Sequence, residues 1–190
     1  MNLTDFLKWY LFAIIIAWVN LPLTHRLFKA LPSRGFALSR PLGLLLWGYL
    51  FWLLTSLKLL NNDLAGQLTA LLLLAAFNLA LLGRGALKTL AAWVRENRKL
   101  ILCVEGLFLV GFATWAFVRA ANPAILGTEK PMEMAFINAI LKSPTFPPND
   151  PLLSGYAISY YYFGYVIAAM LIPVSGSAAA IGYNLVAAMW

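Results

Sequence analysis

Long apolar runs separated by short polar segments dominate the chain. Five runs have about the length that a helix needs to cross a bilayer, roughly 20 residues: 6–23, 42–60, 64–82, 100–118 and 157–174. A sixth run begins at Ser177 and is still unfinished at Trp190, so we expect the chain to be the N-terminal portion of a longer protein. The pattern predicts an all-α polytopic membrane protein with five to six transmembrane helices.

Prolines and tight polar segments mark the ends of these runs. Pro22 and Pro41 bound the first loop, and Pro173 ends the fifth run. We expect three regions: a four-helix transmembrane region over 1–118, a polar loop with a short interfacial helix over 119–156, and further transmembrane helices over 157–190.

The composition agrees with a lipid environment. The chain is 62% hydrophobic and 11% charged, whereas soluble domains carry about 25% charged residues. Cys103 is the one cysteine, which excludes an internal disulfide. The net charge of +7 does not indicate nucleic acid, because the basic residues sit in short loops between apolar runs.

The distribution of Lys and Arg predicts the orientation in the cell membrane, since basic loops stay on the cytoplasmic side. Two loops hold nine of the fourteen basic residues: Arg26, Lys29, Arg34, Arg40, Arg84, Lys88, Arg95, Arg98 and Lys99. We therefore expect the N-terminus and the 119–156 loop to be extracytoplasmic. Trp9, Tyr10, Trp93 and Trp115 lie near run ends, as in the aromatic belts of membrane proteins.

The 119–156 loop holds three of the seven acidic residues, Glu129, Glu133 and Asp150. Apolar residues at 132, 135, 136, 139 and 140 predict a helix over 131–141 that is too short to span a bilayer and should lie in the interface. Thr128 is the expected N-cap of this helix.

Glu129 and Glu133 are four residues apart, so both can face the same way. Two such carboxylates can hold a divalent cation or supply a general base, or they can simply favour the positive end of the helix. Lys130 is either a phosphate ligand or a counter-ion.

The segment after this helix is held extended by Pro147, Pro148 and Pro151. Asn149 and Asp150 therefore have a defined place, where Asp150 either caps a turn or meets a polar ligand. Three aromatic residues, Tyr160, Tyr161 and Tyr162, are expected to open the fifth span as helical residues, with stacking faces suited to sugars or phosphate esters.

Glu105 is the acidic residue within the fourth run. A carboxylate in a membrane span is a functional candidate by default. It lies close to the end of the run, however, so we expect it to reach the interface near Arg98 and Lys99.

The segment from Gly127-Thr-Glu-Lys-Pro-Met-Glu through Phe-Pro-Pro-Asn-Asp-Pro to Tyr-Tyr-Tyr-Phe-Gly164 resembles the Chlor-Arch-YYY family of polytopic membrane proteins, which is named for a Tyr-Tyr-Tyr-x-Gly motif. That family is similar to the GT-C class of membrane glycosyltransferases, which take sugars from polyprenyl phosphates. In those enzymes an acidic motif follows a spanning helix, then interfacial helices, then an aromatic and proline-rich approach to the next span. Here the acid is Glu rather than the usual Asp, and three additional spans precede it.

The resemblance implies a glycosyltransferase with Glu129 as general base or metal ligand and Glu133 as its support. Arg119 and Lys130 would bind the carrier phosphate. Asn149, Asp150 and the three tyrosines would line the sugar or acceptor pocket. The partners would be membrane lipid and a polyprenyl-phosphate sugar. A non-enzymatic membrane subunit or scaffold is the alternative, and a transporter is the third.

The charge distribution makes a topological prediction. A cysteine introduced at Ser143 should react with an impermeant thiol reagent added outside the cell, and one at Ser33 should not. The reverse labelling pattern would invert the orientation.

Overall fold

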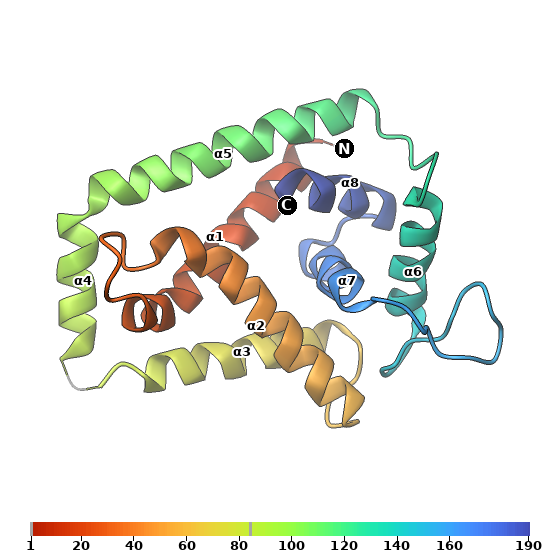
Figure 1. Cartoon of the computed structure of the whole chain (residues 1–190), viewed down its shortest axis with the longest axis horizontal. Helices are drawn as coiled ribbons and strands as arrows, with labels where there is room; N and C mark the ends of the chain where they lie inside the picture. The colour runs from red at the N-terminus through yellow and green to blue at the C-terminus, as the bar shows by residue number, and fades with distance from the viewer. Residues whose placement is uncertain (1, 84) are drawn as a thin grey trace.

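The computed structural model describes residues 2–83 and 85–190 and contains eight α-helices within them (Figure 1). They are α1 (Leu3–Leu27), α2 (Phe36–Ser56), α3 (Leu64–Ala80), α4 (Ala86–Glu96), α5 (Arg98–Ala121), α6 (Lys130–Lys142), α7 (Phe163–Ser175) and α8 (Ala179–Met189). In the view of Figure 1, α3 to α6 form a frame around α1, α2, α7 and α8. This part of the chain has no β-strand, so the all-α fold class is confirmed. Arg84, counted above as a basic loop residue, lies outside the described residues.

The number of membrane spans is lower than predicted. Among the described helices, α1, α2 and α5 are long and apolar enough to cross a membrane. The short helices α7 and α8 satisfy the same criterion only together, and they are bent by 119° at the break between them. The expected span over 157–174 was wrong in its first part, because residues 157–162 are not helical and α7 begins at Phe163. Tyr160, Tyr161 and Tyr162 therefore precede the helix.

The first predicted loop is shorter than expected because its prolines lie inside helices. Pro22 belongs to α1 and Pro41 to α2. Proline is tolerated in membrane helices where neighbouring groups satisfy the freed backbone. The side chain of Asn2 and the carboxylate of Asp5 form a capping box at the start of α1. The segment between the two helices is thus only 28–35.

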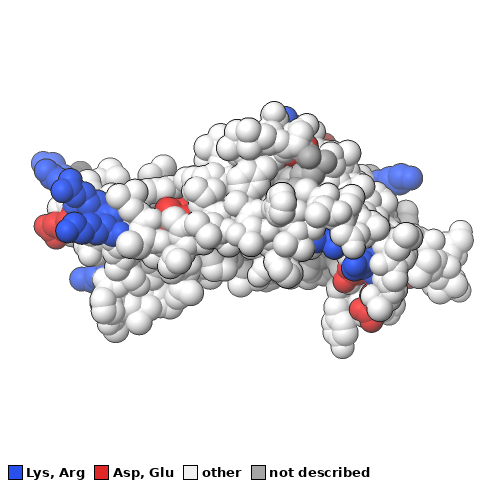
Figure 2. Space-filling view, turned by 90° about the horizontal axis from the view of Figure 1, so that it is seen from above, with Lys and Arg blue, Asp and Glu red and all other residues white. Residues whose placement is uncertain are grey.

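Most of the predicted loop between the apolar runs 64–82 and 100–118 is the amphipathic helix α4. Its residues Leu90, Trp93 and Val94 pack against a small apolar cluster of Leu21, Phe36 and Ile101. Figure 2 shows Lys and Arg gathered at the end of the molecule where α4 lies. Lys88 and Arg95 therefore lie on α4, and Arg98 and Lys99 lie at the start of α5.

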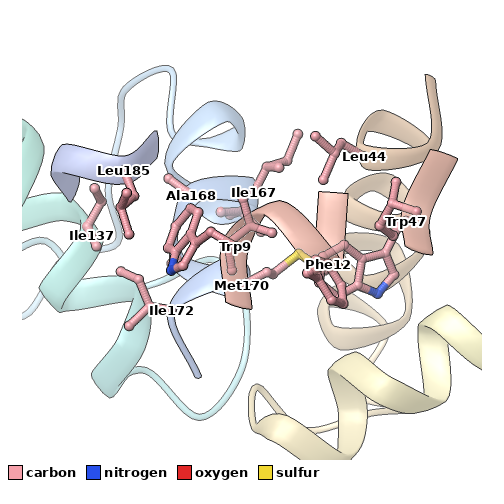
Figure 3. Packing of buried hydrophobic residues seen from close by; sticks show 14 of the residues in the cluster. Trp9, Phe12, Leu44, Trp47, Ile137, Ile167, Ala168, Met170, Ile172 and Leu185 are labelled. Carbon is pink, nitrogen blue, oxygen red and sulfur yellow. The ribbon is translucent and has the colours of Figure 1, made fainter. Parts of the chain in front are cut away.

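The main core lies where α1, α2, α7 and α8 meet. Figure 3 shows Trp9, Phe12, Trp47 and Met170 among its buried side chains. Trp9 is only 2% exposed and its indole N–H donates to the Ser177 hydroxyl at 3.0 Å, so its assignment to an aromatic belt was wrong.

Two glycines allow α2 to pack closely on both sides. A Cβ added at Gly43 would lie 2.7 Å from the Ile16 side chain of α1, and one at Gly48 would lie 2.6 Å from Ile167 of α7. Small residues at such contacts are typical of helix packing in membranes, where close backbone approach maximises dispersion contacts.

The predicted short helix in the polar loop is confirmed as α6, which packs against α7 and α8. Its N-cap is Glu129 rather than Thr128, whose φ of 48° places it in the left-handed region. Ser143 at the other end is only 4% exposed, and its hydroxyl accepts a hydrogen bond from the Asn149 N–H. The exposed Ser154 is therefore the better position for the labelling experiment.

A buried ion pair joins α2 to α5. The Arg40 guanidinium lies 2.6 Å from the Glu105 carboxylate, donates to the Ala13 carbonyl at 3.3 Å, and stacks on the Phe108 ring 3.6 Å from its centroid. The expectation that Glu105 reaches toward Arg98 and Lys99 was wrong. Arg40, counted above as a loop residue, is 8% exposed inside α2. The long Arg40 side chain reaches from α2 to Glu105 and Phe108 of α5, so neither charge has to reach the interface.

Removing one partner of this pair should destabilise the protein. Glu105→Gln leaves the buried Arg40 charge uncompensated, which costs about 3 kcal/mol in comparable sites. Thermal unfolding of the detergent-solubilised chain should show a lower midpoint. Replacing both residues by Met should recover most of the loss, because the uncompensated charge is then gone.

The matched control is Glu96→Gln, which removes an exposed carboxylate at the end of α4. Its unfolding midpoint should match the wild type. Equal midpoints for Glu105→Gln and Glu96→Gln would contradict the stabilising role of the pair.

Candidate functional site

A hydrogen bond between Glu133 and Tyr183 joins α6 to α8. The Tyr183 hydroxyl donates to Glu133 Oε2 at 2.5 Å, and the tyrosine is only 8% exposed. The two residues line a pocket of about 280 Å³ together with Ile137, Gly164, Tyr165, Ala168, Val186, Ala187 and Trp190. The carboxylate is thus held in one orientation at a pocket with mostly apolar walls.

Arg119 is positioned by the next residue of α8. From the last turn of α5, its Nε donates to the Asn184 side-chain carbonyl at 2.8 Å. The Asn184 amide in turn donates to the carbonyls of Pro123 and Ala180. One terminal guanidinium nitrogen of Arg119 is buried without a hydrogen-bond partner in the described residues. A buried donor without a partner is costly, so this nitrogen is suited to an anionic group of a ligand.

Tyr183 and Asn184 therefore hold a carboxylate and a guanidinium on two sides of α8. Consecutive helical residues point about 100° apart, and no ion pair joins Glu133 to Arg119. The two charges flank the helix without neutralising each other. Glu133 lines the pocket described above, whereas Arg119 is not among its lining residues.

Glu129 stands at the N-cap of α6 and is exposed. Its backbone carbonyl accepts from the Glu133 N–H at 2.9 Å, while its carboxylate makes no side-chain hydrogen bond within the described part of the chain. Both glutamates lie within electrostatic range of the Tyr165 hydroxyl. Lys130 is the first residue of α6 and is partly buried. Glu129 is therefore free to act on a bound molecule, whereas Glu133 is tied to Tyr183.

An aromatic pocket of about 440 Å³ lies beside the pocket that Glu133 and Tyr183 line. It is lined by Tyr49, Trp52, Tyr160, Tyr161, Tyr162, Phe163 and Gly164. The Trp52 indole N–H donates to the Tyr162 hydroxyl at 3.0 Å, which fixes one wall. Tyr161 is 88% exposed and presents an open ring.

The two pockets meet at the first turn of α7. Gly164 lines both of them, and a Cβ at this position would meet nothing within 4 Å. The centroid of the Phe136 ring, on α6, lies 5.6 Å from that of Tyr160 and 5.7 Å from that of Tyr165. Phe136 therefore contacts one lining residue of each pocket. A molecule of two chemical parts can therefore lie across Gly164, with one part in each pocket.

Asn149 and Asp150 lie on the hairpin that connects α6 to the tyrosines before α7. The backbone of Asn149 forms a bridge with Ala157, and the Asp150 carboxylate accepts from the N–H groups of Leu152 and Leu153. The Asp150 carboxylate thus closes a turn. Neither residue lines either pocket, so their part in substrate binding stays a prediction.

The carboxylates here are few for a metal site. Within the described residues there is no group of three or more His, Cys, Asp or Glu side chains that could hold a metal ion. Glu129 and Glu133 would need further oxygen ligands from a bound substrate to complete such a site.

Sequence reasoning missed Tyr183, Asn184 and Trp52. Tyr183 and Asn184 lie in an apolar run that was expected only to continue the membrane region. A polar pair within such a run is itself an indication of function, because amides and hydroxyls in lipid require partners. Trp52 lies within the apolar run 42–60, and no local pattern links it to Tyr162.

The bond between Tyr183 and Glu133 can be tested directly. Tyr183→Phe removes the hydroxyl and leaves the carboxylate short of a donor, which should cost about 1.5–3 kcal/mol because one partner is charged. The midpoint of thermal unfolding in detergent should fall. Tyr161→Phe removes the same group from an exposed ring that makes no hydrogen bond in this structure, and it should leave the midpoint unchanged. A Tyr183→Phe protein as stable as the wild type would mean that the bond is dispensable.

Comparison with known proteins places these features in a family. No curated protein and no solved structure matches the chain. Residues 46–190, which include every residue lining the two pockets, match the family described as Uncharacterized membrane protein (DUF2298). This match covers well over half of the chain, and the protein therefore belongs to the DUF2298 family of membrane proteins.

Proposed function

We propose that the protein is a membrane glycosyltransferase of the GT-C type that takes its sugar from a polyprenyl-phosphate donor. The observation that carries the proposal is the pair of neighbouring residues on α8, Tyr183 and Asn184: Tyr183 holds the Glu133 carboxylate in a pocket that adjoins an aromatic one at Gly164, and Asn184 holds the Arg119 guanidinium. The resemblance of residues 127–164 to the Chlor-Arch-YYY family, and through it to GT-C enzymes, supports this choice of reaction.

The chemistry requires a base, a site for a phosphate and a surface for a sugar. An acceptor hydroxyl passes its proton to a carboxylate, and its oxygen forms a bond to the anomeric carbon of the donor sugar. The bond from that carbon to the phosphate oxygen breaks, and the polyprenyl phosphate leaves with the electron pair. The proton finally resides on the departing phosphate, so atoms and charge balance.

Glu129 is assigned as the general base. It is exposed and its carboxylate makes no side-chain hydrogen bond with the described residues, so it can approach a bound hydroxyl. Glu133 lies one turn further along α6, and like Glu129 it is within electrostatic range of the Tyr165 hydroxyl. Because Tyr183 holds Glu133, its role is to position and support rather than to exchange protons.

Arg119 and Lys130 are assigned to the carrier phosphate. Arg119 offers a buried guanidinium nitrogen that lacks a partner in the described residues, and charge-assisted bonds from such a group stabilise the leaving phosphate. Lys130 stands beside Glu129 at the start of α6.

The aromatic pocket is assigned to the sugar or its isoprenoid carrier. Its tyrosines and Trp52 offer ring faces and hydroxyls together, the combination that amphipathic sugars need. Asn149 and Asp150 are assigned to the acceptor side, because their hairpin leads from α6 back to Tyr160.

One observation favours the alternative of a non-enzymatic subunit or scaffold. The hairpin carries Leu152, Leu153 and Tyr156 at 70%, 56% and 64% exposure. Exposed apolar side chains on a loop favour contact with a partner or with lipid. This alternative predicts that the glutamates matter for assembly and not for any transfer of sugar.

The test is Glu129→Gln in membranes that contain the expressed protein, assayed with polyprenyl-phosphate-linked radiolabelled mannose and, in parallel, glucose. The amide keeps the size of the side chain and loses the base, so transfer should fall by about a hundredfold or more. Expression and the thermal midpoint should not change, because Glu129 is exposed.

Tyr161→Phe is the matched control, since it keeps the exposed ring of the aromatic pocket and should lower transfer by less than about threefold. Transfer by Glu129→Gln at the wild-type rate would remove Glu129 from the mechanism. No transfer by the wild type with either donor, together with loss of a copurifying partner on deletion of the hairpin tip, would favour the scaffold.

A further inference from the structure

A third pocket lies at the opposite end of the molecule, between the end of α1, the end of α3 and the start of α4. Its volume is about 350 Å³. Its lining residues are Pro22, His25, Arg26, Lys29, Leu81, Leu82, Gly83, Ala86, Thr89 and Leu90. Basic side chains therefore border a floor of apolar ones, and no acidic residue lines it.

The basic side chains of this pocket have nitrogen atoms that make no hydrogen bond with the described residues. Arg26 uses one terminal nitrogen to donate to the Leu81 carbonyl at 3.0 Å, and the rest of its exposed guanidinium is open. Lys29 is exposed and makes no hydrogen bond or ion pair with the described residues. The Nε2 atom of His25 is buried without a partner in that same part of the chain. Arg34 also lies within electrostatic range of His25.

The start of α4 adds to the positive potential. Its first turn contains no acidic residue, and its N-cap, Gly85, has no side chain. The Ala86 N–H donates to the Gly83 carbonyl and the Lys88 N–H to the Gly85 carbonyl, so the first turn contributes its dipole to the pocket lining at Ala86 and Thr89 rather than a set of free donors. Together with the basic side chains, this makes an anion the expected occupant.

We propose that this pocket binds the phosphate headgroup of an anionic membrane lipid. Basic pockets between membrane helices on the side of the anionic leaflet are suited to such headgroups, and the charge bias of the sequence predicts that side for this end. The apolar floor distinguishes a lipid from a soluble phosphate. Exposed apolar side chains of α3 near the pocket, Phe77 and Leu79 at 55% and 61%, offer a continuation for the acyl chains.

The experiment is a titration of the full purified chain in neutral detergent with phosphatidylglycerol, and separately with phosphatidylcholine, read by native mass spectrometry. Phosphatidylglycerol should bind in preference to phosphatidylcholine. Lys29→Gln should weaken phosphatidylglycerol binding about fivefold, since one basic residue near a lipid phosphate contributes about that much. The variant Arg26→Gln with Lys29→Gln should weaken it further.

Lys142→Gln is the matched control, because it removes an equal charge from an exposed position at the far end of α6. It should bind phosphatidylglycerol as the wild type does. Equal weakening by Lys142→Gln and Lys29→Gln, or equal binding of the two lipids, would overturn the proposal. Inorganic phosphate that protects against lipid binding at the same concentration as the lipid itself would also overturn it, because a lipid site should need the acyl chains.

Since Lys29 is exposed, its substitution should not alter the fold, and an unchanged thermal midpoint of Lys29→Gln confirms that the readout concerns binding.

Discussion

The break between α7 and α8 is the constraint on which the candidate site depends. A membrane helix that stops and turns must satisfy its free backbone groups, because lipid offers no partners. Here Gly176 adopts the left-handed conformation, its N–H donates to the Pro173 carbonyl, and the Ser177 N–H donates to the Ile172 carbonyl. The Ser175 hydroxyl donates to the same Ile172 carbonyl. These local bonds allow a 119° bend.

A hydrogen bond from α1 and a glycine in α8 also maintain the bend. The indole of Trp9 donates to the Ser177 hydroxyl, so α1 fixes the position of the turn. Gly182 permits α8 to fold back, since a Cβ there would collide with the Ile172 side chain. Because α8 returns across α5 and α6, Tyr183 and Asn184 meet Glu133 and Arg119. Without the bend, the carboxylate and the guanidinium would have no common support.

Buried polar pairs appear at two places in the structure and serve different ends. Arg40 and Glu105 form an ion pair between α2 and α5, and the Arg40 guanidinium also stacks on the Phe108 ring. At the candidate site, by contrast, Glu133 and Arg119 each bond to an uncharged side chain and not to each other. A paired charge is suited to holding helices together, whereas an unneutralised charge beside a pocket is suited to acting on a ligand.

The sequence by itself determined the properties that depend on local pattern. Run length and apolar content predicted the helices α1, α2 and α5, and the spacing of apolar residues around Phe136 predicted α6, because these features need no knowledge of distant residues. The tertiary structure alone decided that Glu105 pairs with Arg40, that Tyr183 holds Glu133, and that the tyrosines of residues 160–162 precede a helix instead of opening it. Each polar group in a membrane helix needs a partner, but which partner it finds depends on how helices rotate and bend against one another. That choice is made by packing between residues 50 or more positions apart, as in the Tyr183–Glu133 bond, and no local pattern records it.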